Sequence, residues 1–256
     1  MSLLARLRRG HVSFAGQGDH AGSAFGAETE LEHLATAESF FDWIVESFRD
    51  VVRGHVLEVG AGMGTVAARL AQHHVSSVTA VEPAANLFPR LAEQAARSGF
   101  TALQCTSGEL LDQHPQPFDT IVYVNVLEHI RDDVAELRKA AELCSPGGRL
   151  CIFVPAVPAL YGTLDRKSGH YRRYRKAELV ANVTAGGFRV DDVRYFDVAG
   201  LLPYWLAYRV IGVQSLGGAS TSLFARVLVP VSRGLQWLVR RPPIGKNLIL
   251  SATREP

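Results

Sequence analysis

The sharpest chemical signal in the chain is a glycine-rich turn that follows a short apolar run. The run covers residues 55–60, and three alternating glycines end it: Gly60, Gly62 and Gly64. Glycines let a backbone approach a ligand closely, and the helix that such a turn opens offers unpaired N–H groups. A dinucleotide fingerprint needs its third glycine at position 65, where this chain has Thr65. The turn therefore indicates a ligand site with a poor match to pyrophosphate binding.

Carboxylates accompany this turn and the two runs that follow it. Glu58 lies two positions before the first glycine, Glu82 ends a run over 77–82, and Glu109 follows a run over 101–106. A carboxylate at Glu58 repels phosphate and suits a ligand that carries an ammonium or sulfonium group. Each residue also has a plainer interpretation, since Glu82 could merely end a strand and Glu109 could merely be solvated.

The elements that must position these residues alternate between β-rich and helical patterns. Apolar runs predict strands at 55–60, 77–82, 101–106, 118–125 and 149–155, with helices over 65–74, 87–99 and 132–143 between them. The runs are almost continuously apolar, which is typical of strands buried on both faces of a parallel sheet. Pro146, Gly147 and Gly148 are expected to end the last helix. The pattern predicts a doubly wound α/β layer with ligands at the carboxyl ends of the strands.

The C-terminal part has a different organisation. A helix is predicted over 176–187, a strand over 188–198 and a final strand over 245–254, with a helical insertion at about 199–243 between the two strands. Residues 1–50 are expected to form an N-terminal helical segment, and residues 51–256 one domain.

The order and spacing of these motifs resemble the class I S-adenosylmethionine-dependent methyltransferases. The turn has the family form E/D-x-G-x-G-x-G, Glu82 stands where the family binds both ribose hydroxyls, and residues 118–130 match the family's fourth motif. Many members have Asp where this chain has Glu109. The resemblance implies S-adenosylmethionine as cofactor, S-adenosylhomocysteine as product, and these cofactor-binding residues: Glu58, Gly60, Ala61, Gly62, Gly64, Glu82, Pro83, Gly108, Glu109, Asn125, Val126 and Leu127.

The resemblance also implies a Rossmann-like, seven-stranded sheet of order 3-2-1-4-5-7-6 whose last strand is antiparallel. Methyl transfer to a hydroxyl requires an aligned nucleophile and a group that removes its proton. His170, which follows the fifth strand, is the first candidate base, and His129, which follows the fourth, is the second. Tyr171 is a third catalytic candidate. For His129 the alternative is a structural turn that recurs in the family.

The segment 170–176 concentrates arginines and tyrosines where an acceptor would enter. Such residues suit a carboxylate, phosphate or diphosphate, although a solvated helix start is the plainer explanation. RNA is the least favoured partner, because the sequence pI is about 8.5 and no broader basic domain is present. The GHYRRY pattern resembles a branch of bacterial methyltransferases and implies a small or lipid-linked acceptor. The predicted substrate-binding residues are Tyr161, Arg172, Arg173, Tyr174 and Trp205.

Three functional hypotheses stay open. The first is O-methylation of a small acceptor that is anionic or linked to a lipid or glycan. The second is C-methylation of an apolar anion such as an isoprenoid diphosphate, which needs a carboxylate or aromatic cage for a carbocation. The third is a non-catalytic module that binds S-adenosylmethionine. The apolar, arginine-containing insertion at 199–243 has three roles open to it, in order of preference: a lid over an apolar acceptor, a homodimer interface, or contact with an anionic membrane surface. A plain structural cap is the simpler alternative to all three.

Composition sets the remaining limits. The chain has 256 residues, 47 % of them hydrophobic, and three cysteines, which favours a cytoplasmic protein, with peripheral contact on the inner membrane surface left open. No cysteine–histidine cluster has metal-binding spacing, so no metal site is predicted, and any metal dependence would come from scattered carboxylates. The net charge of +2 combines opposed halves: residues 1–150 carry 12 Lys and Arg against 19 Asp and Glu, and residues 151–256 carry 15 against 6. The acidic half suits a cationic cofactor, and the basic half suits an anionic acceptor.

Overall fold

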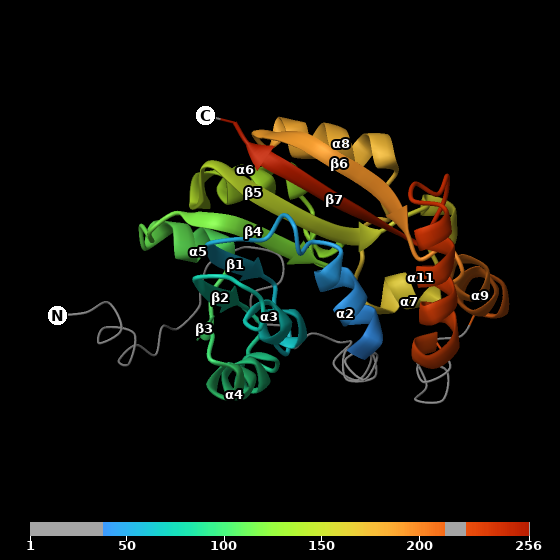
Figure 1. Ribbon diagram of the computed structural model, residues 1–256, viewed down its shortest axis with the longest axis horizontal. Helices are drawn as coiled ribbons and strands as arrows, with labels where there is room; N and C mark the ends of the chain where they lie inside the picture. Colours follow the sequence, from blue (N-terminus) through green and yellow to red (C-terminus); the bar gives the residue numbers. More distant parts are fainter. Residues whose placement is uncertain (1–37, 213–223, 256) are drawn as a thin grey trace.

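The computed structural model describes residues 38–212 and 224–255 and contains a seven-stranded sheet (Figure 1). The order is β3-β2-β1-β4-β5-β7-β6, as predicted. Neighbouring strands from β3 to β5 run parallel, whereas β7 runs antiparallel to both β5 and β6. The strands are β1 His55–Val59, β2 Ser77–Val81, β3 Thr101–Leu103, β4 Phe118–Val124, β5 Cys144–Pro155, β6 Phe188–Phe196 and β7 Asn247–Arg254.

Helices cover both faces of the sheet and give it two hydrophobic cores. Neighbouring residues of β1 show why the strands are apolar throughout, because Val56 packs into one core and Leu57 into the other. The first core includes helices α2 Glu38–Glu46, α3 Thr65–Leu70 and α4 Phe88–Ser98. The second includes α5 Ser107–Asp112, α6 Asp133–Leu143 and α8 Lys176–Ala185. Continuous apolar runs are therefore required for burial on both sides.

Two local predictions differ from the structure. Helix α6 ends at Leu143 and β5 starts at Cys144, so Pro146 to Gly148 lie inside a strand and do not end the helix. In the register between β4 and β5, Phe118 pairs with Cys144 and Thr120 pairs with Arg149. The residues between Cys144 and Arg149 therefore form an irregular bulge, which the positive φ of Gly147 accommodates.

The third strand is also shorter than predicted. It ends at Leu103, and Thr106 becomes the N-cap of α5. The Thr106 hydroxyl accepts a hydrogen bond from the Glu109 N–H, and the Glu109 carboxylate accepts one from the Thr106 N–H. This capping box explains why a helix starts here.

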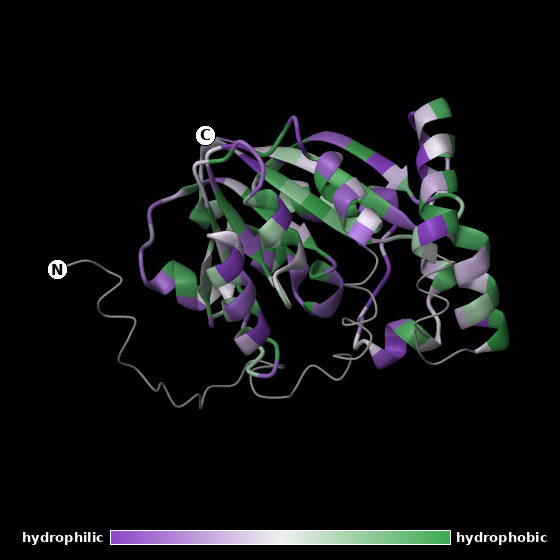
Figure 2. Ribbon diagram, turned by 60° about the horizontal axis from the view of Figure 1, so that its bottom comes forward, coloured by the Kyte–Doolittle hydropathy of each residue, from purple (hydrophilic) through white to green (hydrophobic). Residues whose placement is uncertain are grey.

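The described residues of the insertion between β6 and β7 are mostly helical, as expected, and residues 213–223 lie outside the described ranges. The insertion contains α9 Leu201–Tyr204, the π-helical segments η4 Trp205–Ile211 and η5 Phe224–Leu228, and α11 Val229–Leu238. Figure 1 shows α9 and α11 at one end of the sheet, where α9 and η4 are hydrogen-bonded to α7 Thr163–Lys167. Figure 2 shows hydrophobic residues along these insertion helices as well as in the strands. Within the described ranges, none of the helices has the length and hydrophobicity that crossing a membrane requires.

Candidate functional site

The glycine turn after β1 has a conformation that side chains other than glycine rarely adopt. Gly60, Gly62 and Gly64 have φ values of 68°, 55° and 82°. A Cβ atom at position 60 would lie 2.7 Å from a methyl carbon of Val126, which follows β4. The turn therefore depends on glycine both for its dihedral angles and for the close approach of the β4 exit.

Glu82 connects the end of β2 to this turn. Its Oε2 accepts a hydrogen bond from the Gly62 N–H at 2.8 Å, and its Oε1 accepts one from the Ala84 N–H at 2.9 Å. Burial raises the pKa of Glu82, while these two backbone hydrogen bonds oppose that shift. Pro83, beside it, is exposed. The structure thus brings Glu82, Ala61 and Gly62 together at the carboxyl edge of the sheet.

Glu58 is inside the protein beneath the turn. Only 3 % of the residue is exposed, and its Oε2 has no hydrogen-bond partner among the described residues. Burial raises the pKa of Glu58 to about 8, a backbone hydrogen bond from Ala67 partly offsets this, and nearby Glu82 adds to it. The negative charge that the sequence suggested at Glu58 is therefore largely absent at neutral pH in the ligand-free protein.

Replacing Glu58 with Gln is expected to stabilise the ligand-free protein at pH 8 more than at pH 5. The unfolded chain ionises Glu58 near its usual pKa of 4.5, whereas the folded chain does so only near about 8. Native stability is therefore lost as pH rises through this interval, at about 1.4 kcal/mol per pKa unit as an upper limit. Urea unfolding at both pH values measures the difference, and an equal gain at pH 5 and pH 8 would contradict this assignment.

The exit of β4 supplies the third side of the site. Asn125 has a positive φ of 54°, and its N–H donates to the Phe153 carbonyl at 2.8 Å. Val126 packs against the glycine turn, and the buried Leu127 begins the short helix η2 Leu127–His129. Asn125 and Val126 are partly exposed at the same sheet edge as Glu82.

Gly108 and Glu109 lie in the first turn of α5, after β3. The Glu109 Oε2 accepts from the Thr106 N–H at 2.8 Å and from the Thr106 hydroxyl at 3.1 Å. A Cβ atom at Gly108 would reach only ordinary contact with Lys139. In the ligand-free protein, the Glu109 carboxylate therefore serves the capping box described above.

Asp165, in α7, is the centre of the opposite side of the site and was not predicted from the sequence. It is fully buried, and its Oδ1 accepts from His170 Nδ1 at 2.9 Å and from Arg173 Nε at 2.8 Å. Its Oδ2 accepts from the Gly162 N–H at 2.8 Å and from the Tyr204 hydroxyl at 3.1 Å. Burial alone would raise the pKa of Asp165, but these partners bring it below its usual value. A signal in the sequence that could have pointed to Asp165 is its position five residues before His170, a candidate base.

The two candidate bases meet at this point. The rings of His129 and His170 are edge to face with centroids 4.6 Å apart. The Tyr161 hydroxyl donates to the His170 carbonyl at 2.7 Å, and the Tyr171 N–H donates to the Glu128 carbonyl at 2.8 Å. Because His170 Nδ1 is hydrogen-bonded to Asp165, Nε2 is the nitrogen that can act on a ligand.

Some of the predicted substrate-binding residues belong to a buried hydrogen-bond network, and some line a cavity. Arg173 is 5 % exposed and holds Asp165, and the fully buried Tyr174 donates its hydroxyl to Asp133 Oδ2 at 2.6 Å. Arg172 pairs with the same Asp133 at 3.0 Å. A cavity of about 330 Å³ is lined by Pro158, Tyr161, Tyr171, Arg172, Arg173, Arg175 and Glu178. Tyr174 and Trp205 are not among its lining residues.

Arg175 is the most available cation of this cavity. Its side chain is exposed, and no ion pair in the described part of the chain involves it.

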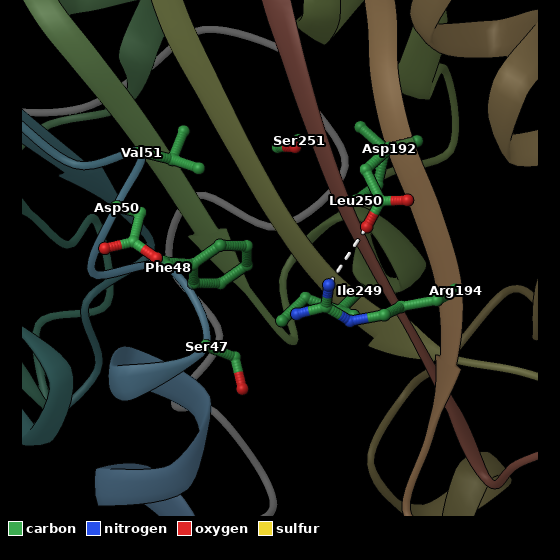
Figure 3. A pocket seen from close by; sticks show the side chains of 9 residues that line it. All are labelled: Ser47, Phe48, Asp50, Val51, Asp192, Arg194, Ile249, Leu250 and Ser251. Carbon is green, nitrogen blue, oxygen red and sulfur yellow. Dashed lines mark hydrogen bonds and ion pairs between the residues drawn. The ribbon is translucent and has the colours of Figure 1, made fainter. Parts of the chain in front are cut away.

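A second hollow of about 240 Å³ lies between the end of α2 and strands β6 and β7 (Figure 3). No predicted site residue lines it, and its Arg194 already pairs with Asp192 at 3.1 Å. The first cavity is therefore the candidate for the acceptor side.

Comparison with known proteins agrees with this geometry. Residues 57–150 match the family described as "Methyltransferase domain". The chain is 28 % identical over 153 residues to a ubiquinone biosynthesis O-methyltransferase of Coxiella burnetii, covering 54 % of this chain and 65 % of the relative. It is 31 % identical over 154 residues to the protein of that name from Xylella fastidiosa, covering 54 % and 62 %. The chain thus spans less than two thirds of the length of these relatives.

Solved structures share the fold. A putative methyltransferase from Bacillus halodurans has a TM-score of 0.57 at 14 % identity, with 85 % of this chain and 100 % of that chain covered. An S-adenosylmethionine-dependent methyltransferase from Mesorhizobium loti has a TM-score of 0.56 at 16 % identity, covering 84 % and 98 %. A phosphoethanolamine N-methyltransferase of Haemonchus contortus, in complex with phosphomonomethylethanolamine and S-adenosylhomocysteine, has a TM-score of 0.59 at 14 % identity, covering 91 % and 59 %. At these identities the likeness establishes the fold.

Proposed function

Because residues 57–150 carry a methyltransferase domain on a class I methyltransferase fold, we propose that this chain transfers the methyl group of S-adenosylmethionine to an oxygen of a small acceptor. The observation that carries the proposal is the meeting of three elements at one sheet edge. These are the glycine turn after β1, Glu82 at the end of β2, and Asn125 and Val126 at the exit of β4.

Each element has a task in binding the cofactor. The turn from Gly60 to Gly64 brings the backbone close to the methionine part. The Glu82 carboxylate exchanges backbone partners for the two ribose hydroxyls, to which it can bond in bidentate geometry. The other proposed cofactor contacts are those named from the sequence: Glu58, Ala61, Pro83, Gly108, Glu109, Asn125, Val126 and Leu127.

Calorimetry with S-adenosylhomocysteine tests this proposal directly. Saturable binding at one site is expected, without any added acceptor or metal ion. Absence of binding would refute both the enzyme and the non-catalytic alternative. Binding without turnover on any small acceptor would instead favour the non-catalytic module.

The chemistry requires alignment and proton removal. The acceptor oxygen attacks the methyl carbon, the S–CH₃ bond breaks as the O–CH₃ bond forms, and the electron pair returns to sulfur. In the metal-free protein, the acceptor proton passes to Nε2 of His170, whose imidazole Asp165 orients through Nδ1 at 2.9 Å. His129 packs edge to face against this ring and is the second candidate. Tyr171 is the third.

Oxygen as the target atom is supported by the names of the curated relatives, which are O-methyltransferases at about 30 % identity. The proposed acceptor is small and anionic or lipid-linked, because its cavity is lined by three arginines. We assign Tyr161 and Arg172 to its walls and Arg175 to its anionic group. Arg173 and Tyr174 support the acceptor side from within the buried network, and Trp205 belongs to the insertion. Methylation at carbon is the alternative that product analysis would reveal.

Replacing Arg175 with Ala is expected to raise the acceptor KM roughly 10-fold, with little change in kcat. The guanidinium contributes a charge-assisted hydrogen bond of about 1.5–3 kcal/mol to an anionic acceptor. Steady-state kinetics with varied acceptor measures the change. Arg97, exposed on α4 and paired with Glu93, offers the matched control, and Arg97→Ala should behave as wild type. Equal kinetics of the two variants would contradict the role of Arg175.

The insertion is proposed to contact an anionic membrane surface. Residues 198–254 contain no Asp or Glu and seven cations: Arg209, Arg226, Arg233, Arg240, Arg241, Lys246 and Arg254. Large apolar side chains of the described insertion residues stay exposed, including Leu202 at 66 %, Trp237 at 81 % and Leu238 at 74 %. Arg241 pairs with Asp192 and Lys246 with Asp197, while the other arginines of the insertion lie among its exposed apolar residues. Exposed apolar side chains interspersed with arginines are typical of an interfacial surface.

The protein is expected to sediment with phosphatidylglycerol vesicles at low salt, and to be released by about 0.5 M salt because screening weakens the attraction. Replacing Trp237 and Leu238 together with Ser should reduce the bound fraction several-fold. Phosphatidylcholine vesicles provide the control. A protein that stays in the supernatant and forms a dimer, which the same double substitution dissociates, would assign this surface to self-association.

A further inference from the structure

Three side chains that can bind a metal ion meet near the proposed acceptor cavity. Two of them are neighbours in the sequence, and the third lies far from them along the chain. Glu128 and His129 belong to η2, after β4, and His170 lies in the segment after α7. One ligand atom of each lies within 4.8 Å of the others. Spacing along the chain could not reveal this group, because a crossover of about forty residues separates its members.

Glu128 lacks the partners that a buried carboxylate requires. The residue is fully buried, and neither carboxylate oxygen has a hydrogen-bond partner among the described residues. An unpaired buried carboxylate is costly, and an unsatisfied buried polar group needs a physical explanation. Arg173, the nearby buried cation, directs its guanidinium to Asp165 and to the Ala156 carbonyl instead. A cation between Glu128 and the histidines would supply the missing partner.

His170 is already oriented as a metal ligand. Its Nδ1 lies 2.9 Å from Asp165 Oδ1, so Nε2 is the nitrogen left to bind an ion. Histidines that bind metals almost always donate their other ring N–H to a carboxylate or carbonyl, which fixes the tautomer and the ring. Asp165 is itself held by Arg173 Nε at 2.8 Å and the Gly162 N–H at 2.8 Å, so this support is rigid.

We propose that Glu128, His129 and His170 bind one transition-metal dication, represented by Zn²⁺. Two imidazoles and one carboxylate form a ligand set of catalytic zinc sites, which keep a further position open. Mg²⁺ and Ca²⁺ prefer oxygen ligands and do not suit two imidazoles. Metal–ligand distances of about 2.0–2.2 Å require the three side chains to close in by small rotations.

The catalytic consequence rests on the proposed function, whereas binding itself does not. Tyr161 lines the cavity and donates its hydroxyl to the His170 carbonyl at 2.7 Å, so the site lies next to the cavity. A cation bound here would have an open position for the acceptor. It would hold the acceptor oxygen and lower the pKa of its hydroxyl. His170 would then serve as a ligand, and only in the metal-free protein would its Nε2 receive the proton.

Cobalt binding tests the site without turnover. Chelator-treated full-length protein is titrated with Co²⁺, and visible absorption bands of a low-coordinate Co²⁺ complex are expected to saturate at one equivalent. Added Zn²⁺ should abolish the bands, and millimolar Mg²⁺ should not. Glu128→Gln keeps the shape of the side chain, and both it and His170→Ala should weaken binding at least 100-fold. Asp165→Asn, which disturbs only the support, should weaken it about 10–100-fold.

Matched variants separate site loss from misfolding. His74 is exposed, so His74→Ala should bind Co²⁺ as wild type does. Thermal unfolding of metal-free Glu128→Gln should show little loss of stability, because the substitution removes a buried carboxylate that has no hydrogen-bond partner among the described residues. Absence of saturable Co²⁺ binding, or unchanged affinity in both Glu128→Gln and His170→Ala, would overturn the proposal. Since cobalt binding needs no cofactor and the calorimetry above needs no metal ion, either proposal can fail alone.

Discussion

Replacing Glu82 with Ala is expected to weaken S-adenosylhomocysteine binding roughly 100-fold, the largest loss for any single cofactor residue. The carboxylate is proposed to bind both ribose hydroxyls, and two charge-assisted hydrogen bonds of about 1.5 kcal/mol each account for this factor. The substitution also frees the Gly62 and Ala84 N–H groups that Glu82 now binds, which loosens the turn in the ligand-free protein. Calorimetry measures the affinity directly.

Two further variants show whether this loss comes from the ribose contact. Glu82→Gln keeps one acceptor oxygen, so we expect an intermediate loss. Glu93→Ala removes an exposed carboxylate on α4 and should leave the affinity unchanged. If Glu82→Ala bound S-adenosylhomocysteine as tightly as Glu93→Ala, the ribose assignment would fail. Thermal unfolding without ligand separates a loosened turn from a lost contact.

Replacing His170 with Ala is expected to lower kcat of the metal-free enzyme by about 10²–10⁴, the usual contribution of a positioned base. The acceptor KM should change little, because the anionic group of the acceptor is proposed to bind Arg175 instead. The fold is expected to persist, since Asp165 keeps Arg173, Gly162 and Tyr204 as partners. Steady-state rates in the presence of a chelator measure the effect.

The pH profile distinguishes a base from a positioning group. In wild type, the rate should rise as pH increases, and His170→Ala should lose this dependence. His129→Ala should keep it. If His170→Ala lowered kcat less than 3-fold and kept the pH profile of wild type, the assignment of His170 as the base would be wrong.

The sheet could be predicted because its strands carry their signal locally. Burial on two faces makes β1, β4 and β5 apolar along almost their whole length, and this needs no knowledge of neighbours. The irregular start of β5 could not be predicted in the same way. Pro146 and Gly147 have the residue types of a helix stop, and only pairing with β4 shows that they form a bulge.

The residues of the candidate site also differ in whether the sequence reveals them. Gly60, Glu82 and Asn125 are found from sequence because each sits at the end of its own strand, and parallel strands bring such ends together. Asp165 was missed because its importance comes from contacts that span the segment after β5 and the insertion. Burial of Glu58, which moves its pKa to about 8, is likewise a property of packing.

The hydroxyl of Tyr204 connects the insertion to the hydrogen-bond network of the candidate base. Tyr204 ends α9, donates to Asp165 Oδ2 at 3.1 Å, and lies under the Arg173 guanidinium at 4.4 Å from its ring centroid. Asp165 in turn holds His170. A displacement of α9 therefore changes the hydrogen bonding around the imidazole even though the two are far apart in sequence. If the insertion contacts a membrane surface as proposed, we expect turnover to rise on binding to that surface, because the contact would reposition Tyr204 and with it the hydrogen bonds of Asp165.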